Sequence, residues 1–275
     1  MRAVRYHDHG GPEVLGVDEV DRPEPDDDQV LVEMRAASVN PVDVMIRSGE
    51  YGKVPLPSVP GGDGAGVVAT TGDDVDRFRE GDRVIASGMD RESGGTFAEY
   101  AALPETKLAQ LPDEVPFEVG GAIGNVGATA WTALEAVAGV SPGDRVLVHG
   151  GAGGVGHAAV QIAAAGGADV IATAGSADAC DRVRELGAST ALQYDSDTLA
   201  EDVLAATTDS KRISISTWRW SPRAGRSSPS WATSRRRTPS PSTARKSPCG
   251  RSGWTTIRSE RLSWSDSVVC YGAAT

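Results

Sequence analysis

Cysteine is scarce in this sequence: the chain has three, Cys180, Cys249 and Cys270, and none precedes residue 180. They are scattered without the spacing of metal ligands, so we predict no metal site. So few cysteines favour a reducing cytoplasm as the setting. The sequence also lacks a long apolar run and a recognisable signal peptide, so we expect no membrane partner.

Lysine is the second scarce residue, with only Lys53 and Lys107 in residues 1–209. That part has 36 acidic and 14 basic residues, a formal charge of −22, whereas residues 210–275 have 2 acidic and 13 basic residues, or +11. The acidic part repels nucleic acid, which is therefore not an expected partner. Its composition is typical of an acidic, halophilic-type surface that high salt screens; an ordinary acidic cytosolic enzyme is the alternative.

Glycine is abundant, and three glycines form a motif. Arg145–His149 has the apolar, β-branched character of a buried strand, and His157–Ala165 that of a helix. Between them Gly151, Gly153 and Gly156 have G-x-G-x-x-G spacing. Such glycines allow a tight turn, close approach to a pyrophosphate and close packing of helix on strand. The motif predicts a dinucleotide site at the helix N-terminus. A glycine-rich turn without a ligand is the alternative.

Residues 1–115 contain short strand-like runs separated by turn residues, and a short helix is predicted to end at Ser48. The predicted strands are Met1–Tyr6, Leu15–Val20, Gln29–Ser38, Gly61–Thr70, Asp82–Ala86 and Gly95–Leu103. This pattern is typical of a small, mostly antiparallel β-barrel domain.

Residues 116–209 alternate helix and strand around the glycine motif, which indicates a Rossmann-type, doubly wound parallel sheet. The other predicted elements are helices at Phe117–Ile123, Ala179–Leu186 and Asp197–Ala206, and strands at Asp169–Ala174 and Thr190–Tyr194. The fold class is therefore α/β, with a β-barrel domain followed by a nucleotide-binding domain.

The composition changes near residue 210. Residues 210–275 hold five of the six tryptophans, 16 serines and the run Arg235-Arg236-Arg237. They show no sustained periodicity, so no further parallel strand is predicted and the sheet is expected to be incomplete at the C-terminus. Our hypothesis is an aberrant, disordered tail translated out of frame. A natural basic tail that binds nucleic acid is the rival.

Several stretches carry a family resemblance: Ser38–Asp43, Arg47–Tyr51, Pro57–Val68, Gly81–Val84 and Gly94–Tyr100. Together with the glycine motif they resemble the zinc-free quinone oxidoreductase branch, the zeta-crystallin-like proteins, of the medium-chain dehydrogenase/reductase superfamily. The resemblance covers roughly residues 1–205. It implies a GroES-like catalytic domain at 1–115 and the first half of a Rossmann NADP-binding domain at 116–209.

The resemblance also bears on metal use. Zinc-dependent members of the superfamily need a cysteine in the loop that is Asn40–Asp43 here, and a His-Glu pair where this chain has Gly62-Asp63. Because these ligand types are missing, we expect zinc-independent chemistry.

The resemblance implies that Asn40 and Tyr51 are the catalytic residues that line the nicotinamide pocket. Asn40 would donate a hydrogen bond to the reacting carbonyl oxygen, and the Tyr51 ring would stack or its hydroxyl donate. The alternatives are an asparagine that caps the turn before Pro41 and a packed surface tyrosine.

Cofactor contacts are implied by the resemblance at Thr129, Gly151, Ala152, Gly153, Gly154, Val155, Gly156, Gly175, Ser176 and Tyr194. Thr129 has the alternative of a helix N-cap or helix-face residue, and Tyr194 that of a plain strand-edge tyrosine. After the strand Asp169–Ala174 the chain has Gly175-Ser176 and no carboxylate to repel a 2′-phosphate. We therefore expect NADP, although Asp178 and Asp181 follow closely and oppose a phosphate.

These observations predict an NADPH-dependent, zinc-independent oxidoreductase that transfers hydride to a small quinone. One alternative is an NADPH-dependent 2-alkenal or enone reductase. Others are an NADPH-binding protein with a structural role and an inactive, truncated NADPH-binding protein. The resembled proteins are homodimers or tetramers, so a homodimer is an expectation.

Overall fold

The computed structural model describes residues 1–52, 54–88, 95–194 and 196–207, and five later strands at 213–217, 232–236, 245–246, 256–258 and 268–269. The chain forms two compact units, residues 1–128 and 129–275. The division falls inside a helix, so each unit is described separately below.

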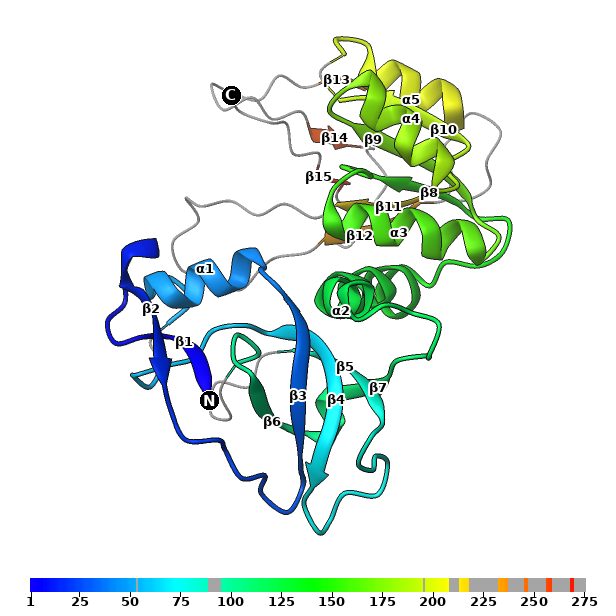
Figure 1. Ribbon diagram of the computed structural model, residues 1–275. Coiled ribbons are helices and arrows are strands. Elements are labelled where there is room, and N and C mark those ends of the chain that lie inside the picture. Colours follow the sequence, from blue (N-terminus) through cyan, green and yellow to red (C-terminus); the bar gives the residue numbers. More distant parts are fainter. Residues whose placement is uncertain are drawn as a thin grey trace. The chain divides into compact units, whose positions relative to one another are not determined.

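Unit 1 is built on an antiparallel five-stranded sheet in the order β6-β3-β4-β5-β7 (Figure 1). Its strands are β3 (Gln29–Ser38), β4 (Asp63–Thr71), β5 (Arg83–Ser87), β6 (Tyr100–Pro104) and β7 (Leu108–Gln110). A hairpin of β1 (Arg2–Tyr6) and β2 (Leu15–Glu19) joins the fold through bridges from Ala3 to Ala98 and from Tyr6 to Ser58. The strands predicted before residue 104 are confirmed, and most of their ends agree to within a few residues. The strand predicted at Gly95–Leu103 starts only at Tyr100. The three-residue β7 was not predicted.

The core of unit 1 follows from the alternation of residues along these strands. Val30, Val32, Val68 and Val84 point to one face and are almost fully buried. The pairing of β3 with β4 shifts between Met34 and Ala36. Such a shift bends the strands, and the bend helps a small sheet to curve toward a barrel.

Two helices complete unit 1. α1 (Pro41–Ser48) starts with proline at its first position and ends at Gly49, which has a left-handed φ of 82°. α2 (Phe117–Trp131) packs on the sheet through glycines: a Cβ on Gly120 would lie 3.1 Å from Ala65 Cβ, and one on Gly121 would lie 3.1 Å from Ala36 Cβ. Short 3₁₀ turns occur at Pro12–Val14 and Glu105–Lys107. None of the helices in the described residues is long and apolar enough to cross a membrane.

Unit 2 contains a five-stranded sheet in the order β10-β9-β8-β11-β12 (Figure 1). After a π-helical segment (Thr132–Ala138) the elements are β8 (Arg145–Val148), α3 (Gly154–Ala165), β9 (Asp169–Ala174), α4 (Ala177–Glu185), β10 (Thr190–Gln193), α5 (Leu199–Thr207), β11 (Ile213–Thr217) and β12 (Ala232–Arg236). β8, β9, β10 and β11 are parallel, and β12 is antiparallel to β11. The predicted α/β class, with an antiparallel domain before a parallel sheet, is confirmed.

The strand β11 corrects one prediction about the tail. The sequence led us to expect no parallel strand after residue 209, but β11 pairs with β8 from Ile213 to Ser216. Isoleucine and serine alternate in this strand, as expected for a strand. The alternation does not stand out because the sequence around it is rich in serine and arginine. β13 (Arg245–Lys246), β14 (Thr256–Arg258) and β15 (Val268–Val269) form a separate small sheet. The rest of the tail, and with it the predicted disorder, lies outside the described residues.

The core of unit 2 lies between its strands and helices. Val146 and Val148 of β8 and Val170 of β9 are almost fully buried together with Val160 of α3 and Val183 of α4. Leu134, in the π-helical segment, belongs to the same cluster and is 1% exposed. A side chain so enclosed cannot be shortened without leaving a cavity.

We therefore expect Leu134→Ala to lower the free energy of unfolding by about 2–5 kcal/mol, since it removes buried methyl groups and leaves a void. Val137→Ala is the control from the same segment, because Val137 is 39% exposed; its effect should stay within about 0.5 kcal/mol. Urea unfolding followed by circular dichroism measures both. Equal losses in the two variants would contradict this account of the core.

Candidate functional site

The glycine loop of unit 2 is fixed to the neighbouring strand by one threonine. Thr173 of β9 is fully buried, and its carbonyl oxygen accepts the N–H of Gly151 at 2.8 Å. Its Oγ1 accepts the N–H of Gly150 at 3.1 Å and lies 3.2 Å from Nδ1 of His149. Burial lowers the pKa of His149, which favours a neutral ring here. These contacts hold the turn after β8 in one conformation.

The same loop leads directly into α3. Gly153 is the N-cap and makes no side-chain hydrogen bond, and Ala152, Gly153 and Gly154 are exposed. A Cβ on Gly156 would clash with the carbonyl oxygen of Gly150, so helix and loop approach as closely as glycine allows. The start of α3 is therefore exposed beside a small-residue loop, an arrangement that suits an anion.

The ends of β9 and β10 bring three further predicted residues together. Tyr194 donates its N–H to the carbonyl oxygen of Ala174 at 3.1 Å. A Cβ on Gly175 would lie 2.6 Å from the Tyr194 hydroxyl oxygen, so the tyrosine side chain lies close over this glycine. Ser176 caps α4, where its Oγ accepts the N–H of Ala179 at 3.2 Å and keeps its own hydrogen for another acceptor.

Thr129 lies inside α2, two residues before its last residue, and is half-buried. The helix N-cap that we considered for it is therefore wrong, and the helix-face alternative describes its position.

Unit 1 contains a cavity of about 360 Å³ that brings both predicted catalytic residues into one wall. The cavity is lined by Asn40, Val42, Ile46, Tyr51, Gly62, Asp63, Gly88 and Asn125. Tyr51 is half-buried and packs with Tyr6, Ile46 and Val54. It is thus a packed aromatic and a cavity residue at once.

Asn40 is the N-cap residue of α1, and its backbone N–H donates to Asp43 Oδ2 at 2.6 Å. Its side-chain amide points elsewhere: Nδ2 donates to Asp63 Oδ2 at 2.9 Å and to Ser38 Oγ at 3.2 Å. The turn-capping alternative therefore describes the place of Asn40 in the chain, whereas its amide group belongs to a polar cluster in the cavity wall.

Asp63 is the centre of this cluster. It is fully buried, and its Oδ2 also accepts the Ser38 hydroxyl at 3.2 Å and the backbone N–H of Asn125 at 3.0 Å. Burial raises the pKa of Asp63 and outweighs the hydrogen bonds that lower it. The sequence pointed to Asp63 only as a failed zinc ligand.

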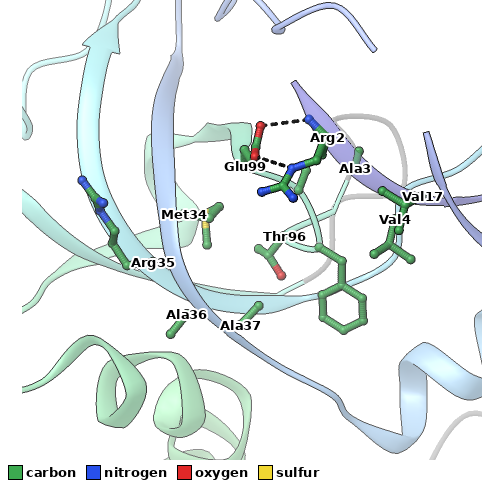
Figure 2. Close-up of a pocket in the computed structure, with 12 residues that line it drawn as sticks. Arg2, Ala3, Val4, Val17, Met34, Arg35, Ala36, Ala37, Thr96 and Glu99 are labelled. Atoms are coloured by element: carbon green, nitrogen blue, oxygen red, sulfur yellow. Dashed lines mark hydrogen bonds and ion pairs between the residues drawn. The ribbon is translucent and has the colours of Figure 1, made fainter. Parts of the chain in front are cut away.

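A second hollow of about 320 Å³ lies in unit 1 beside β1 and β3 (Figure 2). Small and apolar side chains such as Ala36, Ala37 and Met34 form much of its wall. The ion pair of Arg2 with Glu99, 2.8 Å between Nε and Oε1, lies beside it. Hydrogen bonds from the backbone N–H of Arg2 and then from its side chain lower the pKa of Glu99. None of the predicted site residues lines this hollow, so the Asn40 cavity is the candidate active site.

No group of three or more histidine, cysteine, aspartate or glutamate side chains is arranged to hold a metal ion in the part of the chain that the structure describes.

Two known families match the chain. The family described as Alcohol dehydrogenase GroES-like domain matches residues 26–113, and the one described as Zinc-binding dehydrogenase matches residues 154–217. A solved structure named NAD-dependent alcohol dehydrogenase is 38% identical, with a TM-score of 0.72, and the match covers 78% of this chain and 70% of that one. The chain belongs to the medium-chain dehydrogenase/reductase superfamily. The predicted GroES-like and Rossmann domains are thereby confirmed.

Relatives within this superfamily point to its quinone oxidoreductase branch, as predicted. Human quinone oxidoreductase is 46% identical over 190 residues, which are 68% of this chain and 57% of the relative. Escherichia coli quinone oxidoreductase, solved in complex with NADPH, is 32% identical with a TM-score of 0.69, covering 78% of this chain and 64% of that one. CurK enoyl reductase is 25% identical with a TM-score of 0.67, covering 75% and 64%. The chain thus spans little more than half the length of the human relative.

The buried carboxyl of Asp63 should make stability depend on pH. In the folded chain it keeps its proton to a higher pH than in the unfolded chain, so the unfolded state binds fewer protons in that window. The free energy of unfolding must therefore fall as pH rises from the ordinary aspartate pKa through the raised one. Asp63→Asn, which stays neutral, should lose this component. Melting temperatures across the acidic to neutral range should show wild type losing stability relative to the variant as pH rises. A constant or opposite difference would show that the pKa of Asp63 is not raised.

Proposed function

We propose that this chain is an NADPH-dependent oxidoreductase that reduces a quinone without a metal ion. The observation that carries the proposal is the exposed, uncapped start of α3 beside a loop of small residues. The quinone oxidoreductase names of the relatives support the reaction, and the name of the E. coli structure supports the cofactor. Cysteine scarcity supports the cytoplasm as its place of work.

The residues of unit 2 fit a dinucleotide. A Cβ on Gly153 would meet only the Gly150 carbonyl oxygen, at 3.3 Å, so the space in front of the loop is open. The diphosphate would accept hydrogen bonds from the N–H groups at the start of α3, where the helix dipole also favours negative charge. The family resemblance implies further contacts with the cofactor at Ala152, Gly154, Val155 and Thr129.

The preference for NADP rests on the end of β9. Gly175 and Ser176 follow the strand, and the Ser176 hydroxyl can donate to a 2′-phosphate while it caps α4. Tyr194 stands over Gly175 and would pack beside the adenosine. The negative charge of Asp178, in the first turn of α4, would repel a 2′-phosphate. One structural neighbour is named NAD-dependent alcohol dehydrogenase, so NAD is the alternative to test.

The cavity of unit 1 supplies the polar groups for catalysis. When bound, the nicotinamide supplies a hydride. Tyr51 and Asn40 would donate hydrogen bonds to the substrate oxygen on which negative charge develops. Asn40 can provide one amide hydrogen by releasing Ser38, its longer contact at 3.2 Å, while it keeps Asp63 at 2.9 Å. Val42 and Ile46 in the same wall exclude water from the reacting groups.

An enone or 2-alkenal is the second candidate substrate, because a carbonyl conjugated to a double bond needs the same oxyanion donors and because an enoyl reductase is among the structural neighbours. NADPH consumption with a simple quinone and then with a 2-alkenal separates the two. Binding of NADPH without consumption by either would favour a non-catalytic NADPH-binding protein.

For the cofactor site we expect Gly153→Val to weaken NADPH binding by at least about tenfold, or about 1.4 kcal/mol, because its side chain would occupy the diphosphate space. The melting temperature should change little, since Gly153 has an ordinary φ of −80° and open surroundings. Gly16→Val is the matched control, as no atom lies within 4 Å of a Cβ there. Fluorescence titration with NADPH and with NADH measures affinity and preference. Unchanged binding in Gly153→Val would remove the dinucleotide from this loop.

For the catalytic cavity we expect Tyr51→Phe to lower kcat with the preferred substrate by about 100-fold, the usual cost of one oxyanion donor. NADPH affinity should persist. Tyr100→Phe is the control, because Tyr100 contacts Arg22 through its ring, 4.0 Å from the guanidinium carbon, and loses only a hydroxyl outside the cavity. A normal kcat in Tyr51→Phe would leave Tyr51 as a packed aromatic without a catalytic role.

A further inference from the structure

His149 directly follows the last residue of β8 and precedes the glycine loop, and its side chain is half-buried. In the sheet, β8 has β9 on one side and β11 on the other (Figure 1). The chain runs outward from β8 to β9 and β10 and then returns to β11, so the order of the strands reverses at β8. In open parallel sheets, ligands bind outside the carboxyl ends of the strands at such a reversal. The side chain of His149 therefore begins where a ligand is expected.

The hydrogen bonds of Thr173 determine the tautomer of the His149 ring. One lone pair of Thr173 Oγ1 accepts the N–H of Gly150 at 3.1 Å, and His149 Nδ1 lies 3.2 Å from the same oxygen. Thr173 is fully buried, and within the described part of the chain Nδ1 is the one acceptor for its hydroxyl hydrogen. A proton on Nδ1 would leave that hydroxyl hydrogen buried without a partner, which is unfavourable. The hydroxyl therefore donates to Nδ1, and we assign the ring proton to Nε2.

This tautomer makes Nε2 a hydrogen-bond donor. Burial lowers the pKa of His149, so at neutral pH the ring is neutral and has a single N–H. Nε2 makes no hydrogen bond to any other residue that the structure describes. The two ring nitrogens point in diverging directions. Because Nδ1 faces Thr173 of β9, Nε2 faces away from β9, toward the side of β8 on which β11 lies.

The proposed cofactor contacts indicate which part of a dinucleotide lies on that side. Ser176 follows β9 and Tyr194 follows β10, and both are proposed to contact the adenosine half. The diphosphate would lie at the start of α3, after the loop that His149 precedes. A dinucleotide with its adenosine half on one side of β8 has its nicotinamide half on the other side. Nε2 faces this second side.

We propose that the Nε2–H of His149 binds the nicotinamide half of the cofactor by donating to an oxygen of its ribose or of the adjoining phosphate. This contact rests on the proposed function, because it needs a bound dinucleotide. Thr173 is the positioning residue: it is fully buried and acts by holding the ring proton on Nε2. His149 thus contributes to binding and orientation, and no bond to it forms or breaks during hydride transfer.

Nuclear magnetic resonance tests the tautomer without cofactor or substrate. The chain has four histidines, and the ring signals that disappear in His149→Phe belong to His149. At neutral pH, long-range proton–nitrogen spectra should show a protonated Nε2 and an unprotonated Nδ1. Thr173→Ser should keep this pattern, whereas Thr173→Val, which lacks the hydroxyl, should show both tautomers. A wild-type ring with its proton on Nδ1 would overturn the proposal, and an unchanged pattern in Thr173→Val would overturn the role of Thr173.

Cofactor titration tests the contact. We expect His149→Phe, which keeps a planar ring but has no N–H, to weaken NADPH binding by about tenfold or more, through the loss of one hydrogen bond. Binding of 2′,5′-ADP, which represents the adenosine half alone, should stay within about twofold of wild type. His149→Gln, whose amide can donate, should recover part of the NADPH affinity. If wild type prefers NADH, then NADH and AMP replace the two ligands.

His7→Phe is the matched control, because His7 is exposed in unit 1, where its Nε2 lies 2.9 Å from Asp18 Oδ2. It should bind NADPH like wild type. If His149→Phe does not fold, the wild-type spectrum decides: NADPH should shift the Nε2–H signal of His149, and a signal that NADPH leaves unchanged would overturn the contact.

The results distinguish this contact from the proposed function. A wild type that binds neither NADPH nor NADH overturns the proposed function and the contact with it. Normal NADPH binding by His149→Phe, with a wild type that binds, overturns only the role of His149. Equal losses of NADPH and 2′,5′-ADP affinity in His149→Phe would also overturn that role, because they indicate a distorted loop rather than a lost contact with the nicotinamide half.

Discussion

Unit 1 depends on a single buried oxygen, Oδ2 of Asp63, where hydrogen bonds from β3, α1 and α2 meet the first residue of β4. Asn40 is buried, so its amide would lose a hydrogen-bond partner in the protein interior without this acceptor. Because Asn40 and Asp63 also line the cavity, the contact that holds these elements in place also shapes the candidate active site. Stability and function therefore share the same atoms in this part of the fold.

Unit 2 holds its candidate site in place through contacts to the backbone rather than through a side-chain carboxyl. The proposed dinucleotide site lies at the start of α3, and the chain must hold the turn after β8 without covering it. Thr173 does so from behind, through its carbonyl oxygen and its hydroxyl, while Gly156 allows α3 to approach the carbonyl oxygen of Gly150. Residues 1–209, which include this loop, carry a formal charge of −22. A diphosphate bound there would rely on these local N–H dipoles and not on a favourable overall field.

The sequence predicted elements whose pattern is local and long enough to read. β3 and β9 were predicted at their observed bounds, and the glycine spacing identified the loop before α3. β7 was missed because three residues give too little periodicity to recognise, and β11 because its sequence surroundings are rich in serine and arginine. Asn40 and Tyr51 were expected in the nicotinamide pocket through the family resemblance; both line one cavity, and their catalytic role stays a prediction. The role of Asp63 could not be predicted, since its partners at residues 38, 40 and 125 are distant in sequence and meet only in the folded chain.

The contacts of Thr173 have a consequence for ligand affinity. They fix the main chain at Gly150 and Gly151 through hydrogen bonds that exist before any ligand arrives. A dinucleotide that enters such a preorganised loop does not have to pay for freezing it, so little conformational entropy is lost on association. The same rigidity limits the range of anions that the loop accepts, because a phosphate of different shape finds no adjustable backbone to meet it.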